Sequence, residues 1–469
     1  MSQMVGRDCE YEASKASFLD PAVPQIAAVE TFLAPKPAAT AHLKNAVIQH
    51  LAPYTPEIAL AAYQEAIEPW FPIATRLQGR LQFTWDETPL DVALLCLSIS
   101  LLTTSPSSTS KSAGNASEPE SIYLRTKSSL ALAEGLGLNS FSIIHSRILV
   151  TLFEVSHGLY PAAFISIGAT VRATDALEVH PREDTLQHGS PNGAASDDEI
   201  IMTWCGILVL DRYIAAESGP RSSLTRSRTE WLHDLVKSAI CPSLEPNQDR
   251  QSLYSRFARL VEASSLLDKM YTTISNPTSE QTFNMEEVML IVKTSMSLQT
   301  ILSEEIPPED HLYSAGLCLC HVTLLVAYEK GTKGPCSVNA AENWNSLATT
   351  MLISLLSTIT STVEVFATVK RSIDFSSFPP FVTSLVYKAA LITTERLSMG
   401  LDADEGLARL RTLRKFLRVV SKRWLCCGKL NGTSRRSSEL TTAERYLKLL
   451  DEDTTPRMLK TIEQRQGSS

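Results

Sequence analysis

The chain has 469 residues, of which 44% are hydrophobic and 20% are charged, and its formal net charge is −8. This length allows one large core or two ordinary cores, and the acidic balance argues against a protein that coats nucleic acid along its whole length. The polar start of the sequence and the lack of a long uninterrupted apolar run predict a soluble intracellular protein without a signal peptide or membrane span.

The chain divides into a lead-in, one large helical domain and a tail. Residues 1–40 mix prolines with small residues and are typical of a loosely ordered lead-in. Residues 41–450 then carry the apolar spacing of helices, and residues 451–469 form a C-terminal tail. Two polar stretches within the domain, 103–121 and 182–199, are too poor in apolar residues to fold by burial and are interpreted as flexible surface loops.

The stretch from residue 143 to residue 221 organises the rest of the chain. Its apolar residues recur at intervals of three and four, which predicts amphipathic helices. Gly158 followed by Pro161 ends the first helix and lets the second turn back on it, and Pro181 halts the second. An acidic cluster that begins at Asp197 suits the N-terminus of a third helix. These helices are expected to pack on one another.

The same spacing continues on both sides of this stretch. It predicts helices over 90–102, 122–133, 250–275, 284–305, 311–329, 341–368, 380–399 and 407–429. No alternating run is long enough to indicate a strand. The sequence therefore predicts an all-α protein, a multi-helix array of stacked antiparallel helical hairpins.

Several charged residues fall within these apolar helices. Arg172 and Asp175 lie on the second helix of the central stretch, and Asp211 and Arg212 follow Trp204 on the third. A buried charge needs a partner, so we expect ion pairs or helix-end hydrogen bonds, with Arg172 to Asp211 as one option. No nucleophile or oriented histidine accompanies these residues, so the prediction is a structural motif and no enzyme.

The nine cysteines are scattered and form no CxxC pair, which argues against a structural zinc site. The nearest approach to a metal site is the set His311, Cys318, Cys320 and His321. Cysteine and histidine are often buried, so we interpret these four residues as part of the core. No metal site and no cofactor are predicted.

A basic surface is predicted near the end of the helical domain. Leucines at 410, 413 and 417 step by three and four, which predicts a helix with an apolar stripe. The residues expected on the opposite side are Arg411, Arg414, Lys415, Arg418, Lys422 and Arg423. A solvated face is the simpler interpretation, and binding of nucleic acid or of an acidic partner is the alternative.

The central stretch also resembles a known family. The segments LFEVSHGLYPAAF (152–164), GATVRATDALEVHPRE (168–183) and WCGILVLDRYIAAESGPR (204–221) are similar to the regulatory middle region of fungal zinc-cluster transcription factors. The Gly-Pro-Arg at 219–221 departs from the Gly-Arg-Pro that is common in the family. The family binds DNA through an N-terminal cluster of six cysteines that holds two zinc ions, and only Cys9 lies near this N-terminus.

The resemblance implies a nuclear transcription regulator. Such a protein would modulate metabolic genes, including secondary-metabolite clusters, by binding a DNA-binding partner, a second copy of itself or a small effector, with indirect contact to DNA. Three explanations for the missing zinc cluster are open. The cluster is encoded in an upstream segment, the protein works beside a DNA-binding partner, or it has a role like that of a transcription cofactor. The alternative function is a cytoplasmic α-helical scaffold or adaptor unrelated to transcription.

Overall fold

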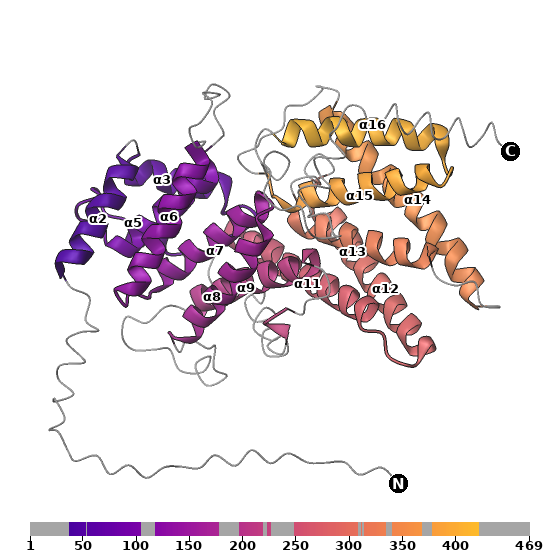
Figure 1. Cartoon of the computed structure of the whole chain (residues 1–469), viewed down its shortest axis with the longest axis horizontal. Coiled ribbons are helices and arrows are strands. Elements are labelled where there is room, and N and C mark those ends of the chain that lie inside the picture. The colour runs from indigo at the N-terminus through magenta and orange to yellow at the C-terminus, as the bar shows by residue number, and fades with distance from the viewer. Residues whose placement is uncertain are drawn as a thin grey trace, which may run out of the picture.

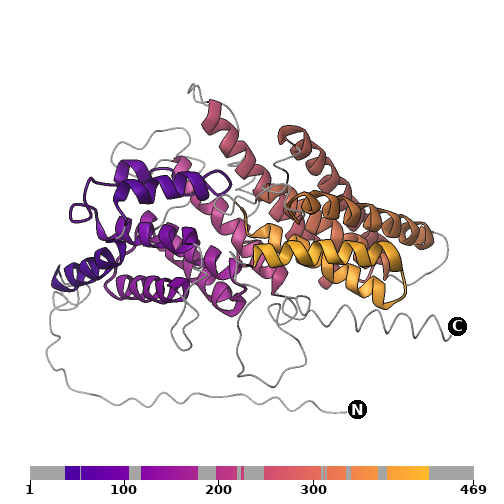
Figure 2. The same ribbon diagram turned by 90° about the horizontal axis from the view of Figure 1, so that it is seen from above.

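The structure is a computed structural model that describes residues 37–52, 54–104, 118–177, 197–218, 223–226, 248–307, 311, 314–333, 340–367 and 378–421. Within these ranges every element of regular secondary structure is a helix, which confirms the all-α prediction. Helices α2 to α8 lie on one side of the molecule and α12 to α16 on the other, with α9 and α11 between them (Figures 1 and 2).

The N-terminal side is built from short and medium helices. These are α2 (Pro37–Leu51), α3 (Pro56–Ala66), α4 (Leu77–Arg80), α5 (Leu90–Thr103), α6 (Glu118–Gly135), α7 (Phe141–Ser156) and α8 (Tyr160–Asp175). The central helices are α9 (Asp197–Glu217) and α11 (Gln248–Ser275). α8 ends at Asp175, before the stop expected at Pro181. α2 begins inside the predicted lead-in 1–40, and residues 118–121 and 197–199 of the two predicted loops are helical, so these predicted boundaries were wrong. The lead-in up to residue 36 and most of both loops lie outside the described residues.

The C-terminal side contains longer helices. These are α12 (Gln281–Glu305), α13 (Ala315–Thr332), α14 (Ala340–Ala367), α15 (Phe381–Ser398) and α16 (Ala403–Val420). α16 begins earlier than the predicted helix over 407–429, and the described residues end at 421. The predicted tail therefore lies outside them.

The turn at Gly158 has the predicted geometry. Gly158 has φ of 69°, in the left-handed region that glycine adopts without a steric penalty. Beyond it, the N–H of Leu159 donates to the carbonyl oxygen of Glu154 at 2.8 Å, which closes the end of α7. α8 starts two residues after the glycine, with Pro161 in its first turn. The chain thereby reverses and packs α8 against α7.

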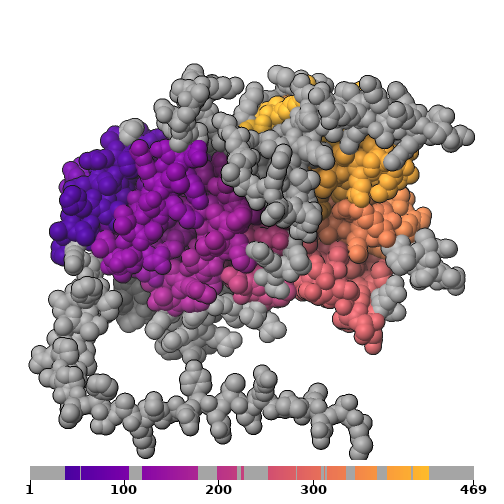
Figure 3. All heavy atoms as spheres, viewed as in Figure 1, coloured from indigo at the N-terminus to yellow at the C-terminus, as the bar shows by residue number. Residues whose placement is uncertain are grey.

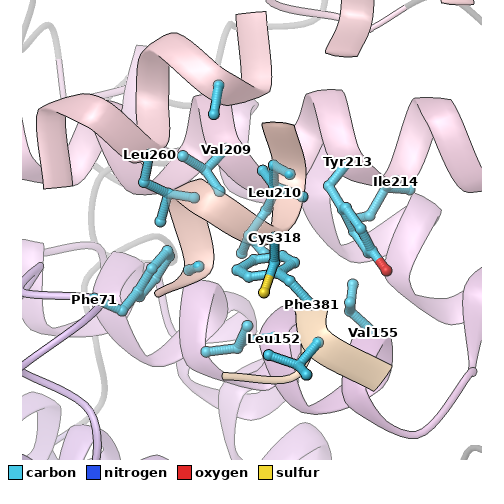
Figure 4. Packing of buried hydrophobic residues seen from close by; sticks show 14 of the residues in the cluster. Phe71, Leu152, Val155, Val209, Leu210, Tyr213, Ile214, Leu260, Cys318 and Phe381 are labelled. Carbon is cyan, nitrogen blue, oxygen red and sulfur yellow. The ribbon is translucent and has the colours of Figure 1, made fainter. Parts of the chain in front are cut away.

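One core joins the two sides. Its buried side chains come from α7, α9, α11, α13 and α15 and from the segment after α3, as Figure 4 shows for a part of them. The ring of Phe71 meets that of Phe257 edge to face at 5.4 Å between centroids, and Tyr213 meets Phe381 in the same way at 4.9 Å. Such aromatic contacts stabilise the core beyond the effect of the apolar area that they bury. α9 thus connects both sides.

The described helices include one stretch, Trp344–Phe366 in α14, that is long and apolar enough to cross a membrane by length and composition alone. The large apolar residues along one side of this helix, such as Leu352, Leu356 and Val363, are buried in the core. α14 packs against α13 and α16 through this side. These contacts are those of an amphipathic helix in a helical array.

Candidate functional site

Charged and hydroxyl side chains gather where α9, the segment 223–226 and α11 meet. The group consists of Asp211, Arg212, Thr225, Arg226, Ser264 and Asp268, and we call it the α9–α11 charge cluster. It lies at the middle of the array, because α9 and α11 are the helices between the two sides (Figure 1).

Asp211 accepts hydrogen bonds from one residue of the 223–226 segment. Asp211 is 3% exposed. Its Oδ2 accepts hydrogen bonds from the N–H of Thr225 at 2.8 Å and from the Thr225 hydroxyl at 2.7 Å. Burial raises the pKa of Asp211, and the hydrogen bonds from Thr225 oppose this rise. The carboxylate therefore anchors the 223–226 segment to α9.

Arg212 connects α9 to α11. It is 2% exposed, and its guanidinium donates to the carbonyl oxygen of Val261 at 3.3 Å and to the hydroxyl of Ser264 at 3.1 Å. Burial lowers the pKa of Arg212, while the carboxylates of Asp268 and Asp211 raise it. A guanidinium stays protonated in proteins, so Arg212 contributes a buried positive charge.

Arg226 and Asp268 complete the cluster with a two-point ion pair. Nε of Arg226 lies 3.0 Å from Oδ2 of Asp268, and a terminal guanidinium nitrogen lies 2.8 Å from Oδ1. This fork geometry is the strongest form of an arginine–carboxylate contact. The hydrogen bond to Asp268 raises the pKa of Arg226. Together with Asp211 and Arg212, the cluster holds two acids and two guanidinium groups, so its formal charges balance.

The arrangement is suited to holding elements together. Each polar group that we have described in the cluster donates to or accepts from another part of the fold, and the cluster contains no cysteine, histidine or lysine that would act as nucleophile or base. In the part of the chain that the structure describes, no group of three or more His, Cys, Asp or Glu is placed to hold a metal ion. Cys318 and Cys320 are buried free thiols on α13.

The structure separates the residues that the sequence predicted as a motif. Trp204, Asp211 and Arg212 are buried on α9, whereas Arg172 on α8 is exposed and Asp175 is half-buried. The optional pairing of Arg172 with Asp211 does not form, because the Asp211 carboxylate is bound by the 223–226 segment instead. The predicted need for a partner at Asp211 and Arg212 is met by residues that sequence reasoning missed.

A second polar contact, also missed, lies at the C-terminal end of α9. The hydroxyl of Ser384 on α15 donates to Oε1 of Glu217 at 2.8 Å, and Nζ of Lys388 lies 3.4 Å from the hydroxyl of Tyr271 on α11. Burial raises the pKa of Glu217, and the charge of Lys388 opposes the rise. This contact fixes α15 to α9 and α11. The signal in the sequence is that Glu217 directly follows the apolar residues 213–216 at the end of α9.

A third polar group supports the start of α9. Arg80 donates to Oε2 of Glu199 at 2.7 Å, and Glu199 is fully buried. Nε2 of His145 lies 2.8 Å from the hydroxyl of Thr203. Because that hydroxyl donates to the carbonyl oxygen of Glu199 at 2.6 Å, it accepts from His145. Burial and the nearby Arg80 lower the pKa of His145 to about 3, so this histidine is neutral at ordinary pH.

The predicted basic surface is narrower than the sequence indicated. Arg411, Lys415 and Arg418 are exposed along one face of α16, but Arg414 is 6% exposed and belongs to the buried side. The reason is helix geometry, because position 414 is four residues after Leu410 and three before Leu417, and both leucines face the core. Lys422 and Arg423 lie outside the described residues. We call Arg411, Lys415 and Arg418 the α16 basic face.

Comparison with known proteins gives one informative similarity. The sequence is 29% identical over 123 residues to a protein named transcription factor BOA15 from Botryotinia fuckeliana (strain B05.10). The similar stretch covers 26% of this chain and 65% of that protein, which is less than two thirds of its length. No family model matches the sequence, and no solved structure matches it significantly. The distant similarity points to a transcription regulator and carries no detail about a region or a target.

Proposed function

We propose that the protein is a transcription regulator that acts by binding other molecules through its helical array. The observation that carries the proposal is the similarity to a fungal transcription factor. The α9–α11 charge cluster supports it, since charged groups paired with one another fix helices in place and offer no free acid or base for catalysis. Because residues 152–221 resemble a regulatory region of fungal transcription factors, we propose metabolic genes as the targets.

We propose further that contact with DNA is indirect and that the α16 basic face binds an acidic segment of a partner protein. Arg411 and Arg418 are seven residues apart, which is about 10 Å along a helix. Lys415 lies between them on the same face. Three like charges at this spacing suit an acidic peptide, and the chain as a whole is acidic, which disfavours DNA over most of its surface.

The first experiment tethers the full chain to a reporter promoter through an unrelated DNA-binding domain. A regulator is expected to raise or lower reporter transcription several-fold relative to the DNA-binding domain alone. The variant with Arg411, Lys415 and Arg418 all changed to Glu should lose most of this effect. The matched control changes the two arginines to Lys and the lysine to Arg, which keeps the charge and should keep the effect.

The second experiment separates indirect from direct DNA contact. Titration of the full chain with fluorescent duplex DNA should show no binding that weakens as salt is raised. A fluorescently tagged chain should collect in the nucleus. Exclusion from the nucleus, combined with an inert tethered fusion, would contradict the proposal and favour the cytoplasmic scaffold instead.

A further inference from the structure

The outer face of α12 carries large apolar side chains in contact with solvent. Leu290 is 64% exposed and Phe283 is 51% exposed, and Ser297 is exposed one further heptad along. α12 packs on α11 and α13 through its other side, where Val292 and Leu302 are buried. In Figure 1 the helix forms the lower edge of the C-terminal side, and Figure 3 shows its surface there. Exposed apolar stripes of this kind mark interaction sites.

The charges beside this stripe are arranged in a simple pattern. With 3.6 residues per turn, Leu290 lies at the centre of the face, and Phe283 and Ser297 lie on the same line, seven residues before and after it. Glu286 and Lys293 lie together along one flank of that line, on opposite sides of Leu290, and both are exposed. Neither side chain forms an ion pair with another residue of the described ranges. Within about one turn of Leu290, this flank therefore carries an acid before the leucine and a base after it.

We propose that α12 is the contact of a symmetric dimer, in which it packs antiparallel on α12 of a second copy with the two-fold axis beside Leu290. A two-fold axis at this position reverses the direction along the helix and keeps each flank on its own side, so a residue before Leu290 lies opposite a residue of the same flank at a matching distance after it. Leu290 then meets the same residue of the second copy. Phe283 and the small Ser297, each seven residues from Leu290, lie opposite each other. Glu286 is four residues before Leu290 and Lys293 is three residues after it, so the two lie opposite each other to within one residue's rise, about 1.5 Å.

The Phe283–Ser297 and Glu286–Lys293 pairings each occur twice in the dimer, because a two-fold contact is self-complementary. The face therefore matches itself in size, large against small, and in charge, acid against base. An unrelated partner would not require a large and a small residue seven positions on either side of one leucine, with an acid four positions before it and a base three positions after it on one flank. This symmetry identifies a second copy as the occupant, and the inference holds whether or not the protein regulates transcription.

The test is the mass of the full chain in solution, measured by light scattering and by sedimentation over a range of concentrations. We expect concentration-dependent formation of a dimer. Lys293→Glu and Glu286→Lys should each weaken the dimer about tenfold or more, because each change replaces two attractive contacts by two repulsive ones. The double variant restores opposite charges and should recover dimerisation. Lys415→Glu, an exposed reversal on α16, is the control and should leave the dimer unchanged.

A cross-linking experiment locates the contact. Leu290→Cys should be joined to the second copy by a short bismaleimide, since residue 290 faces itself across the axis. Thr300→Cys is exposed on the same helix but lies away from its counterpart, so it should give only the background of the unsubstituted chain. A chain that stays monomeric at every concentration overturns the proposal, and so does a dimer that is indifferent to both charge reversals. All these positions are exposed, so circular dichroism should show each variant folded.

Discussion

Replacement of Asp211 by alanine tests whether the α9–α11 charge cluster holds the centre of the fold. The change removes the acceptor of two buried donors on Thr225, which lie 2.8 and 2.7 Å away, and deprives Arg212 of a neighbouring negative charge. A buried donor left without an acceptor costs about 1–3 kcal/mol, and removal of one member of a buried charge pair costs about 3–5 kcal/mol. Burial already disfavours the charged form of Asp211, as its raised pKa shows, so part of this cost is offset. We expect a loss of about 3 kcal/mol.

The assay is the free energy of unfolding, measured by urea denaturation with circular dichroism at neutral pH. Thr225→Val removes only the hydroxyl donor and should cost about 1 kcal/mol. Asp211→Asn keeps an acceptor but loses the charge, so its stability should fall between those of the wild type and Asp211→Ala. Arg172→Ala, at an exposed position on α8, is the control and should stay within about 0.5 kcal/mol of the wild type. An Asp211→Ala variant as stable as this control would refute the structural role of the cluster.

Two further substitutions test the packing and the electrostatics around α9. A Cβ atom at Gly206 would lie 2.7 Å from Cγ2 of Ile73, so Gly206→Ala should lower the melting temperature and cost about 1–3 kcal/mol, whereas Gly79→Ala, with open space around it, should not. His145 has a folded-state pKa lowered to about 3, below its unfolded value of about 6.5, so unfolding takes up a proton between these two pH values. Stability should therefore fall as pH drops from 6.5 towards 3, by up to about 1.4 kcal/mol per pH unit. His145→Gln, which can still donate to Thr203 but does not titrate, should flatten this fall, and an unchanged pH profile would contradict the assignment.

The sequence predicts the helices well because their signal is local. The spacing of apolar residues marks α7 and α11 to within two residues at each end. The end of α8, which the sequence placed at Pro181, was predicted less well. Pro181 forbids a helix beyond it but does not require the helix to continue that far, so the chain is free to leave the helix at Asp175.

The partners in the α9–α11 charge cluster could not be predicted in the same way, because they are set by contacts between distant segments. Arg226 and Asp268 are 42 residues apart along the chain, and each alone looks like an ordinary solvated charge. The burial of Asp211 was predictable from α9 itself. Residues 201–216 are buried all round the helix, so any charge in that run has to be buried. α8 buries only a stripe that includes Ile167, Val171 and Thr174, and Arg172 lies one position off this stripe, so it turns to solvent. The width of the buried face therefore decides the fate of these two charges, because Asp211 lies on a run that is buried all round and needs a partner, whereas Arg172 lies beside a narrow stripe and does not.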